Sequence, residues 1–286
     1  MSYLRANGVV LNVEVRGRGE PTVLISDIGE DLTSWCYQAR TFGSLHFLLQ
    51  LDNRGSGRSD CPPEGCSIKD MAKDVLSAMD LIGVDKAHLV GLGLGGMIAQ
   101  MIALLRPGRV GGLVLVSTSS RATEEQREVY EKWVRSANDG HDRREISRNI
   151  VPWLYSSWFL ENERWREFVI KARGSRYGQT CWEGAAAQLK AMLDFDSSER
   201  LGDIASPTLV VSGSEDRITP PECSKSIHAG IKGSRHLQLR AGHLLHVELP
   251  RSFNQAVLGF LAEVEGCPAP DLGPGPPLPC GGCLGL

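Results

Sequence analysis

This 286-residue sequence lacks an apolar run approaching the ~18 residues that a membrane-spanning helix needs, and Met1 to Val10 do not form a basic start followed by a long apolar stretch. A strong excess of one charge is also absent, since 31 basic and 34 acidic residues leave a formal net charge of -3 without any basic stripe. We therefore expect no membrane or nucleic-acid partner. The composition, 42% apolar and 23% charged, is that of an ordinary globular chain, for which a cytoplasmic location is the expectation.

Signs of a disulfide framework, a metal site or a cofactor site are missing as well. The eight cysteines have no regular spacing, and the chain is long enough to build a core without disulfides, so we expect most of them to be free thiols. Cys280 and Cys283 form a C-x-x-C pair, but no second pair and no histidine lies near them, which argues against zinc. The loop at residues 54–57 lacks the strand-to-helix setting and downstream lysine of a phosphate cradle. The sequence implies neither a metal nor a cofactor.

Short apolar runs alternate with helical patterns through residues 1–118, which predicts a mostly parallel sheet covered by helices on both faces. One helix is expected over Ile68 to Ile82, with Ser67 and Asp70 as its capping box, and another over Met97 to Leu105. The expected strands are Val9 to Val15, Thr22 to Ser26, Leu45 to Asp52, Ala87 to Gly91 and Gly112 to Ser117. After residue 200 the sheet resumes with strands at Pro207 to Ser212 and Arg235 to Arg240, and helices near 222–230 and 250–264.

Residues 119–200 interrupt this alternation. Helical patterns follow one another near 124–137, 144–155, 158–173 and 182–193 without an intervening β-branched run, and 11 of the 18 aromatic residues fall in this part. We expect a helical insertion here. Twelve of the 21 residues in 266–286 are Gly or Pro, which predicts a flexible tail.

The most informative segment is Val90-Gly91-Leu92-Gly93-Leu94-Gly95-Gly96. It lies between an expected strand and an expected helix, which is the setting of the nucleophile elbow G-x-S-x-G. Gly93 stands where that pattern has its serine. Because acyl transfer on this scaffold needs the serine hydroxyl, we do not expect ester hydrolysis through an acyl-enzyme.

Three further motifs accompany the elbow. Residues 51–60 read Leu-Asp-Asn-Arg-Gly-Ser-Gly-Arg-Ser-Asp, residues 211–216 read Val-Ser-Gly-Ser-Glu-Asp, and residues 241–250 read Ala-Gly-His-Leu-Leu-His-Val-Glu-Leu-Pro. In this order they resemble the loops of the α/β-hydrolase fold family over about residues 7–265. The resemblance implies a mostly parallel eight-stranded sheet flanked by helices. It divides the chain into a core at 1–118 and 201–265, a helical cap at 119–200 and the tail at 266–286.

The resemblance also implies site residues. Asp216 and His243 fall where the family places the acid and the base of its triad, with Glu215 and His246 as less favoured neighbours. The backbone N-H groups of Leu94 and Ile28 fall where the family forms its oxyanion hole. The family's His-Gly dipeptide after the third strand is replaced by Ser26-Asp27. This second departure beside Gly93 favours natural divergence over an engineered substitution.

We therefore expect a small-molecule enzyme without a nucleophilic serine, in which a His243-Asp216 dyad performs non-covalent acid-base chemistry of the lyase, isomerase, cyclase or cofactor-free oxygenase type. A catalytically silent ligand-binding protein and a hydrolase that uses a His-activated water are the alternatives. Asp27 and Ser26 are candidate pocket groups, and Ser26 and Cys36 are weaker candidates for a displaced nucleophile. An aromatic lining suits an aromatic or polyketide-like ligand, and the pocket candidates from the cap are Trp133, Trp153, Trp158, Trp182 and Tyr155.

Overall fold

The computed structural model describes residues 2–139, 143–176 and 181–273. Cys280, Cys283 and most of the expected tail lie outside these residues. The strands are β1 (Ser2–Ala6), β2 (Val9–Arg16), β3 (Pro21–Ile25), β4 (Phe47–Leu51), β5 (Ala87–Leu92), β6 (Val110–Val116), β7 (Thr208–Gly213) and β8 (Arg235–Leu239). The helices of four or more residues include α1 (Cys36–Gly43), α2 (Ile68–Leu81), α3 (Leu94–Leu105), α4 (Glu124–Asn138), α5 (Arg143–Leu154), α6 (Ser157–Glu161), α7 (Glu163–Arg176), α8 (Trp182–Leu193), α9 (Pro221–Gly230), α10 (Leu245–Glu248) and α11 (Pro250–Glu265).

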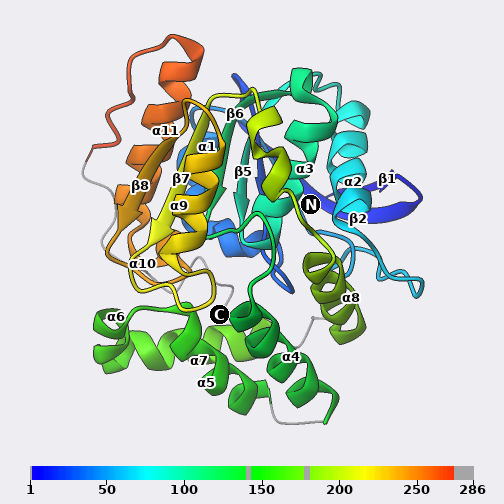
Figure 1. Ribbon diagram of the computed structural model, residues 1–286, viewed down its shortest axis with the longest axis vertical. Helices are drawn as coiled ribbons and strands as arrows, with labels where there is room; N and C mark the ends of the chain where they lie inside the picture. Colours follow the sequence, from blue (N-terminus) through cyan, green and yellow to red (C-terminus); the bar gives the residue numbers. More distant parts are fainter. Residues whose placement is uncertain (1, 140–142, 177–180, 274–286) are drawn as a thin grey trace.

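The eight strands form one sheet in the order β1-β2-β4-β3-β5-β6-β7-β8. The pairs β1-β2 and β2-β4 are antiparallel, and every later pair is parallel. Helices flank the sheet, with α2 packed against α3 and α1 against α11 (Figure 1). The prediction of a mostly parallel sheet covered by helices is confirmed. The central strands coincide with expected apolar runs because they are buried in the middle of the sheet, whereas β1 lies at its edge, is largely exposed and has no such run.

Local signals explain where several helices begin and end. Ser67 Oγ accepts from the N-H of Asp70 at 3.1 Å, and Asp70 Oδ2 accepts from the N-H of Ser67 at 3.2 Å, so the predicted capping box starts α2. The pattern expected as a single helix over 158–173 is divided into α6 and α7. Asn162 lies at the break, where its Oδ1 accepts from the N-H of Trp165 at 3.2 Å and thereby caps α7.

Helices α4 to α8, which we call the cap helices, fall between β6 and β7 in the sequence. In the view of Figure 1, α4 to α7 lie below the sheet and α8 lies at the right, above α4. A disulfide joins Cys181, at the start of α8, to Cys61 in the loop that follows β4. Cys61 and Cys181 are the exceptions to the expectation that most cysteines are free, because the fold brings together residues 120 positions apart, which spacing cannot reveal. Among the described cysteines, Cys36, Cys66, Cys223 and Cys267 carry free thiols, so the expectation is confirmed for most of them.

Candidate active site

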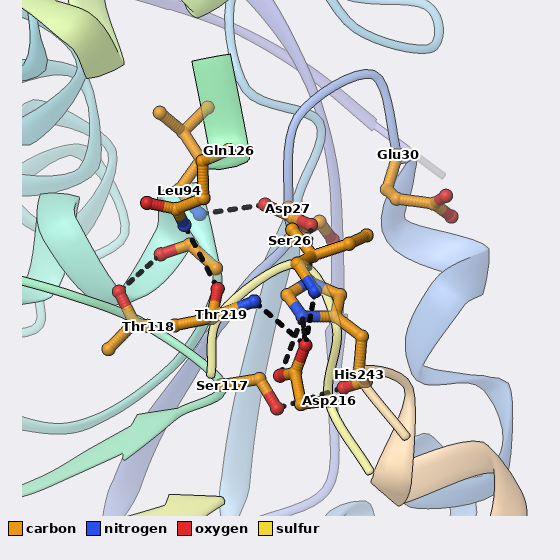
Figure 2. A network of polar contacts seen from close by, with 12 residues as sticks. Ser26, Asp27, Glu30, Leu94, Ser117, Thr118, Gln126, Asp216, Thr219 and His243 are labelled. Carbon is orange, nitrogen blue, oxygen red and sulfur yellow. Dashed lines mark hydrogen bonds and ion pairs between the residues drawn. The ribbon is translucent and has the colours of Figure 1, made fainter. Parts of the chain in front are cut away.

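Four loops meet at the edge of the sheet where the parallel strands end. Asp27 follows β3, Gly93 and Leu94 follow β5, Asp216 follows β7 and His243 follows β8. Figure 2 shows these side chains converging on one network of polar contacts. The carboxyl ends of parallel strands are where α/β sheets place their ligand sites.

Gly93 occupies the turn between β5 and α3 with φ of +52°, a conformation that residues with a side chain rarely adopt. Its N-H donates to the carbonyl of Val116 at 3.0 Å, and its carbonyl accepts from Thr118 Oγ1 at 2.6 Å. A Cβ built at this position lies 2.0 Å from Asp27 Oδ1 and 2.7 Å from Asp27 Oδ2. The Asp27 carboxylate therefore fills the space that a side chain at position 93 needs.

Asp27 is 3% exposed, and each of its carboxylate oxygens has a donor from another loop. Oδ1 accepts from the N-H of Leu94 at 2.7 Å, and Oδ2 lies 3.1 Å from His243 Nε2 (Figure 2). Leu94 is the first residue of the twelve-residue helix α3, where the helix dipole favours a negative charge. The N-H expected to serve an oxyanion is thus occupied by the protein's own carboxylate.

His243 connects Asp27 to Asp216. Its Nδ1 lies 2.9 Å from Asp216 Oδ2, and Asp216 Oδ1 accepts from the backbone N-H groups of Ile218 at 2.9 Å and Thr219 at 2.8 Å. Burial alone lowers the pKa of His243, but the carboxylates of Asp216 and Asp27 outweigh it and raise this pKa to about 10. Both ring nitrogens face carboxylates, an arrangement that favours an imidazolium donating to both.

A cavity borders Asp27, and His243 is not among its lining residues. Its walls are mostly apolar, and its polar groups are Asp27, Glu30, Tyr130 and Arg173. Arg173 from α7 forms a buried ion pair with Glu30, which lies in the loop after β3. The remaining lining residues are Ile28, Gly29, Trp133, Val134, Ile150, Leu154, Trp182, Ala185 and Leu244. Of Asp27, His243 and Asp216, Asp27 is the residue that borders this cavity, and His243 is 0% exposed.

The structure sorts the expected pocket residues into three groups. Trp133, Trp182 and Ile28 line the cavity beside Asp27, and Tyr155 lines a second cavity that shares Glu30, Arg173 and Leu244 with the first. Trp153 is 36% exposed and Trp158 donates through Nε1 to the carbonyl of Arg240 at 3.1 Å, so neither lines these two cavities. Trp153 faces outward and Trp158 packs along the core. Residue type alone does not show which tryptophans line a cavity.

Ser26 is also displaced from its expected role. Its hydroxyl lies 3.1 Å from Ser34 Oγ and 3.2 Å from the carbonyl of Asp31, within the loop that follows β3. Neighbouring residues on an extended segment point in opposite directions, so the backbone that sends Asp27 into the site turns Ser26 away from it. Ser26 therefore lacks the contact with His243 that a displaced nucleophile needs.

Glu248 and Glu215 hold the site loops to the cap helices. In the sequence, Glu248 is part of the motif at residues 241–250 and Glu215 is the neighbour of Asp216. Glu248, fully buried, accepts from the N-H of Gly242 at 2.9 Å and from the N-H of Ser156 at 3.0 Å. Glu215 accepts from the N-H of Ser157 at 3.0 Å. Glu215 thus serves the start of α6, and of these two neighbours it is Asp216 that contacts His243 Nδ1.

Sequence reasoning misses Tyr130, Arg173 and Glu30 as cavity residues. Tyr130 stands out in the sequence only as one of the aromatic residues of the insertion, and charged residues on helical patterns usually face solvent. Within the described part of the chain, no group of three or more His, Cys, Asp and Glu side chains is arranged to hold a metal ion. No helix among the described residues is long and apolar enough to span a membrane.

The comparison with known proteins agrees with this architecture. A family model described as the alpha/beta hydrolase fold matches residues 23–250. The chain belongs to the α/β-hydrolase fold family.

Several relatives match over nearly their whole length. The putative carbamate hydrolase RutD of Variovorax paradoxus is 31% identical over 270 residues, which cover 91% of this chain and 99% of the relative. The 3-oxoadipate enol-lactonase 1 of Acinetobacter baylyi is 24% identical and is covered to 95%, against 90% of this chain. Among solved structures, the enol-lactonase from Burkholderia xenovorans has a TM-score of 0.83 at 25% identity, with 91% of this chain and 100% of that chain covered.

Proposed function

We propose that this protein is a small-molecule enzyme that works without a serine acyl-enzyme and performs acid-base chemistry through Asp27, His243 and Asp216. The observation that carries the proposal is the position of Asp27, which lies between the cavity and the His243 imidazolium. Asp27 is then the group that exchanges a proton with the substrate. His243 and Asp216 hold the charge of the site and orient the carboxylate.

Covalent acyl transfer is disfavoured on two grounds. Gly93 offers no hydroxyl, and loss of the nucleophile from a serine triad lowers kcat on the order of 10⁶-fold. The Leu94 N-H, which a carbonyl oxygen would need, already binds Asp27 Oδ1 at 2.7 Å.

This arrangement changes which residue meets the substrate. The sequence favours His243 as the base, but both of its nitrogens face carboxylates and its pKa is raised to about 10. An imidazolium cannot accept a proton, whereas Asp27 borders the cavity and has lone pairs to accept one. Proton abstraction from a bound carbon or hydroxyl supports reactions of the lyase, isomerase, cyclase or cofactor-free oxygenase type.

The walls of the cavity indicate the kind of substrate. Tyr130, Trp133 and Trp182 come from the cap helices and face a cavity whose other walls are largely aliphatic. Such a lining favours a planar, largely apolar molecule, for example an aromatic or polyketide-like compound. In this proposal the cap helices act as one cap that closes the site.

Proton exchange in heavy water tests the role of Asp27. 2-Tetralone, a planar ketone with acidic C-H bonds, is incubated with the protein in D₂O, and deuterium incorporation is followed by mass spectrometry. We expect Asp27→Asn to slow exchange by ~10²–10⁴-fold, the usual contribution of a positioned base. Asp31→Asn, the same chemical change in the same loop, serves as the control because Asp31 caps the short helix at Leu32–Trp35 and does not line the cavity. Equal exchange by the wild type and Asp27→Asn contradicts the proposal.

Two other functions have specific support. The names of the relatives favour a hydrolase, in which Asp27 activates a water molecule for direct attack on a bound carbonyl. Occupation of the Leu94 N-H and of both His243 nitrogens by the protein itself favours a silent ligand-binding protein. Release of acid from an enol lactone that depends on Asp27 supports the first, and tight ligand binding without any exchange or hydrolysis supports the second.

A further inference from the structure

Tyr130 brings a phenol hydroxyl from α4 into the cavity beside Asp27. The side chain is 3% exposed, and its hydroxyl lies 3.4 Å from Asp27 Oδ2. Trp133 packs edge-on against the ring with the centroids 4.9 Å apart, which fixes the ring. A hydrogen bond of this length is weak, so the hydroxyl is free to rotate toward a better acceptor.

The proposed chemistry needs a donor at this place. When Asp27 removes a proton from a carbon next to a carbonyl, the electrons of the C-H bond move onto the carbonyl oxygen. Negative charge in a largely apolar cavity requires a hydrogen-bond donor aimed at it. The Leu94 N-H, which has this role in an acyl-transfer site, is bound to Asp27.

Tyr130 remains a donor under all ordinary conditions. Burial and the carboxylates of Asp27 and Asp216 raise the pKa of the Tyr130 phenol well above its usual value, so its proton stays on the oxygen. The cationic donor in this cavity, Arg173, is engaged in its ion pair with Glu30. The hydroxyl of Tyr130 is therefore the donor best placed for a substrate oxygen beside Asp27.

We propose that Tyr130 is a catalytic residue that donates a hydrogen bond to the substrate oxygen on which negative charge develops, and that the substrate is a planar carbonyl compound with an acidic C-H next to the carbonyl. This inference rests on the proposed function. The proton moves from the substrate carbon to Asp27, the C-H electrons move to oxygen, and Tyr130 keeps its own proton. Return of the proton to the same or another carbon completes the cycle without an oxidant or reductant.

Binding of a stable enolate mimic tests Tyr130 without turnover. 4-Nitrophenol has a planar ring and an oxygen that becomes negative on ionisation, whereas 4-nitroanisole has the same ring and cannot ionise. We expect the wild type to bind 4-nitrophenol at least ~10-fold more tightly, since a hydrogen bond to a charged group contributes about 1.5–3 kcal/mol. Tyr130→Phe should lose most of this preference. Tyr155→Phe, the same change in the neighbouring cavity, should retain it.

Two further measurements keep the inference separate from the proposed function. Replacement of Tyr130 by 3-fluorotyrosine preserves the shape and strengthens the donor, so 4-nitrophenol should bind more tightly. In Asp27→Asn, which removes the negative charge beside the probe, the preference for 4-nitrophenol should persist and should still depend on Tyr130. A preference for 4-nitrophenol that is absent from the wild type, or unchanged in Tyr130→Phe, overturns the role of Tyr130. Equal deuterium exchange of 2-tetralone by the wild type and Asp27→Asn instead overturns the role of Asp27.

Discussion

Introducing a serine at position 93 should destabilise the protein, and Asp27 should be the reason. The new Cβ lies 2.0 Å from Asp27 Oδ1, so the carboxylate must leave its place and lose its contacts with Leu94 N-H and His243 Nε2. Two hydrogen bonds to a charged group contribute about 3–6 kcal/mol together. The positive φ of Gly93 adds strain of about 1–3 kcal/mol for a residue with a side chain. We therefore expect Gly93→Ser to lower the free energy of unfolding by at least ~4 kcal/mol.

The same substitution in an Asp27→Ala background should be much milder, because only the backbone strain of about 1–3 kcal/mol remains. Urea unfolding of the wild type, the two single variants and the double variant measures this difference as a coupling free energy. The double variant should also gain hydrolysis of 4-nitrophenyl acetate that depends on His243, since the introduced hydroxyl then has the space beside that ring. Equal destabilisation by Gly93→Ser in both backgrounds refutes the contact between positions 27 and 93.

Three further predictions concern stability. The N-H of Gly112 donates to His88 Nδ1 at 2.7 Å, which only the neutral ring accepts, and burial lowers the pKa of His88 to about 4. His88 in the unfolded chain is protonated below about pH 6.5, whereas the folded chain keeps it neutral down to about pH 4. The free energy of unfolding should therefore fall by up to ~3 kcal/mol as the pH drops from 6.5 to 4. Urea midpoints of His88→Gln should show less of this loss. Glu248→Ala leaves the buried N-H groups of Ser156 and Gly242 without their acceptor, so it should lower the free energy of unfolding in urea by about 2–6 kcal/mol. Glu248→Gln keeps an acceptor oxygen and should recover most of this free energy. Unchanged urea midpoints in Glu248→Ala contradict the prediction. Loss of the Cys61–Cys181 disulfide should lower the free energy of unfolding by about 2–5 kcal/mol. Dithiothreitol should therefore lower the melting temperature of the wild type to that of a variant without this disulfide, and a melting temperature independent of dithiothreitol contradicts the prediction.

The sequence predicts the sheet and two members of the site because these depend on local patterns. Apolar runs bounded by turns mark the central strands, and the positions of Asp216 and His243 follow from their motifs. The contact between Asp27 and His243 joins residues 216 positions apart, so neither pattern nor spacing indicates it. The sequence draws attention to Asp27 as a departure, but only the structure shows that its carboxylate reaches the space above Gly93.

The cap helices are harder to interpret from sequence. Trp133 stands among charged residues in the sequence and Trp153 among apolar ones, yet Trp133 lines the cavity and Trp153 is 36% exposed. Whether a helix side faces the sheet domain depends on how the helices pack on each other, which hydrophobic periodicity alone does not define. The disulfide between Cys61 and Cys181 escapes prediction for the same reason, since it depends on where α8 sits over the loop that follows β4.

The protonation state of His243 tests the central claim most directly. The two carboxylates on either side of the ring should outweigh its burial and keep it doubly protonated, with a pKa of about 10, far above the ordinary histidine value. Nitrogen-15 NMR of the labelled protein, with His243→Gln to assign the signal, should show an imidazolium at pH 7 and a lower pKa in Asp27→Asn. The stabilisation from this raised pKa should be complete below pH 6.5 and should disappear as the pH rises through 10. A His243 ring that is neutral at pH 7, or whose pKa is the same in Asp27→Asn, contradicts the account.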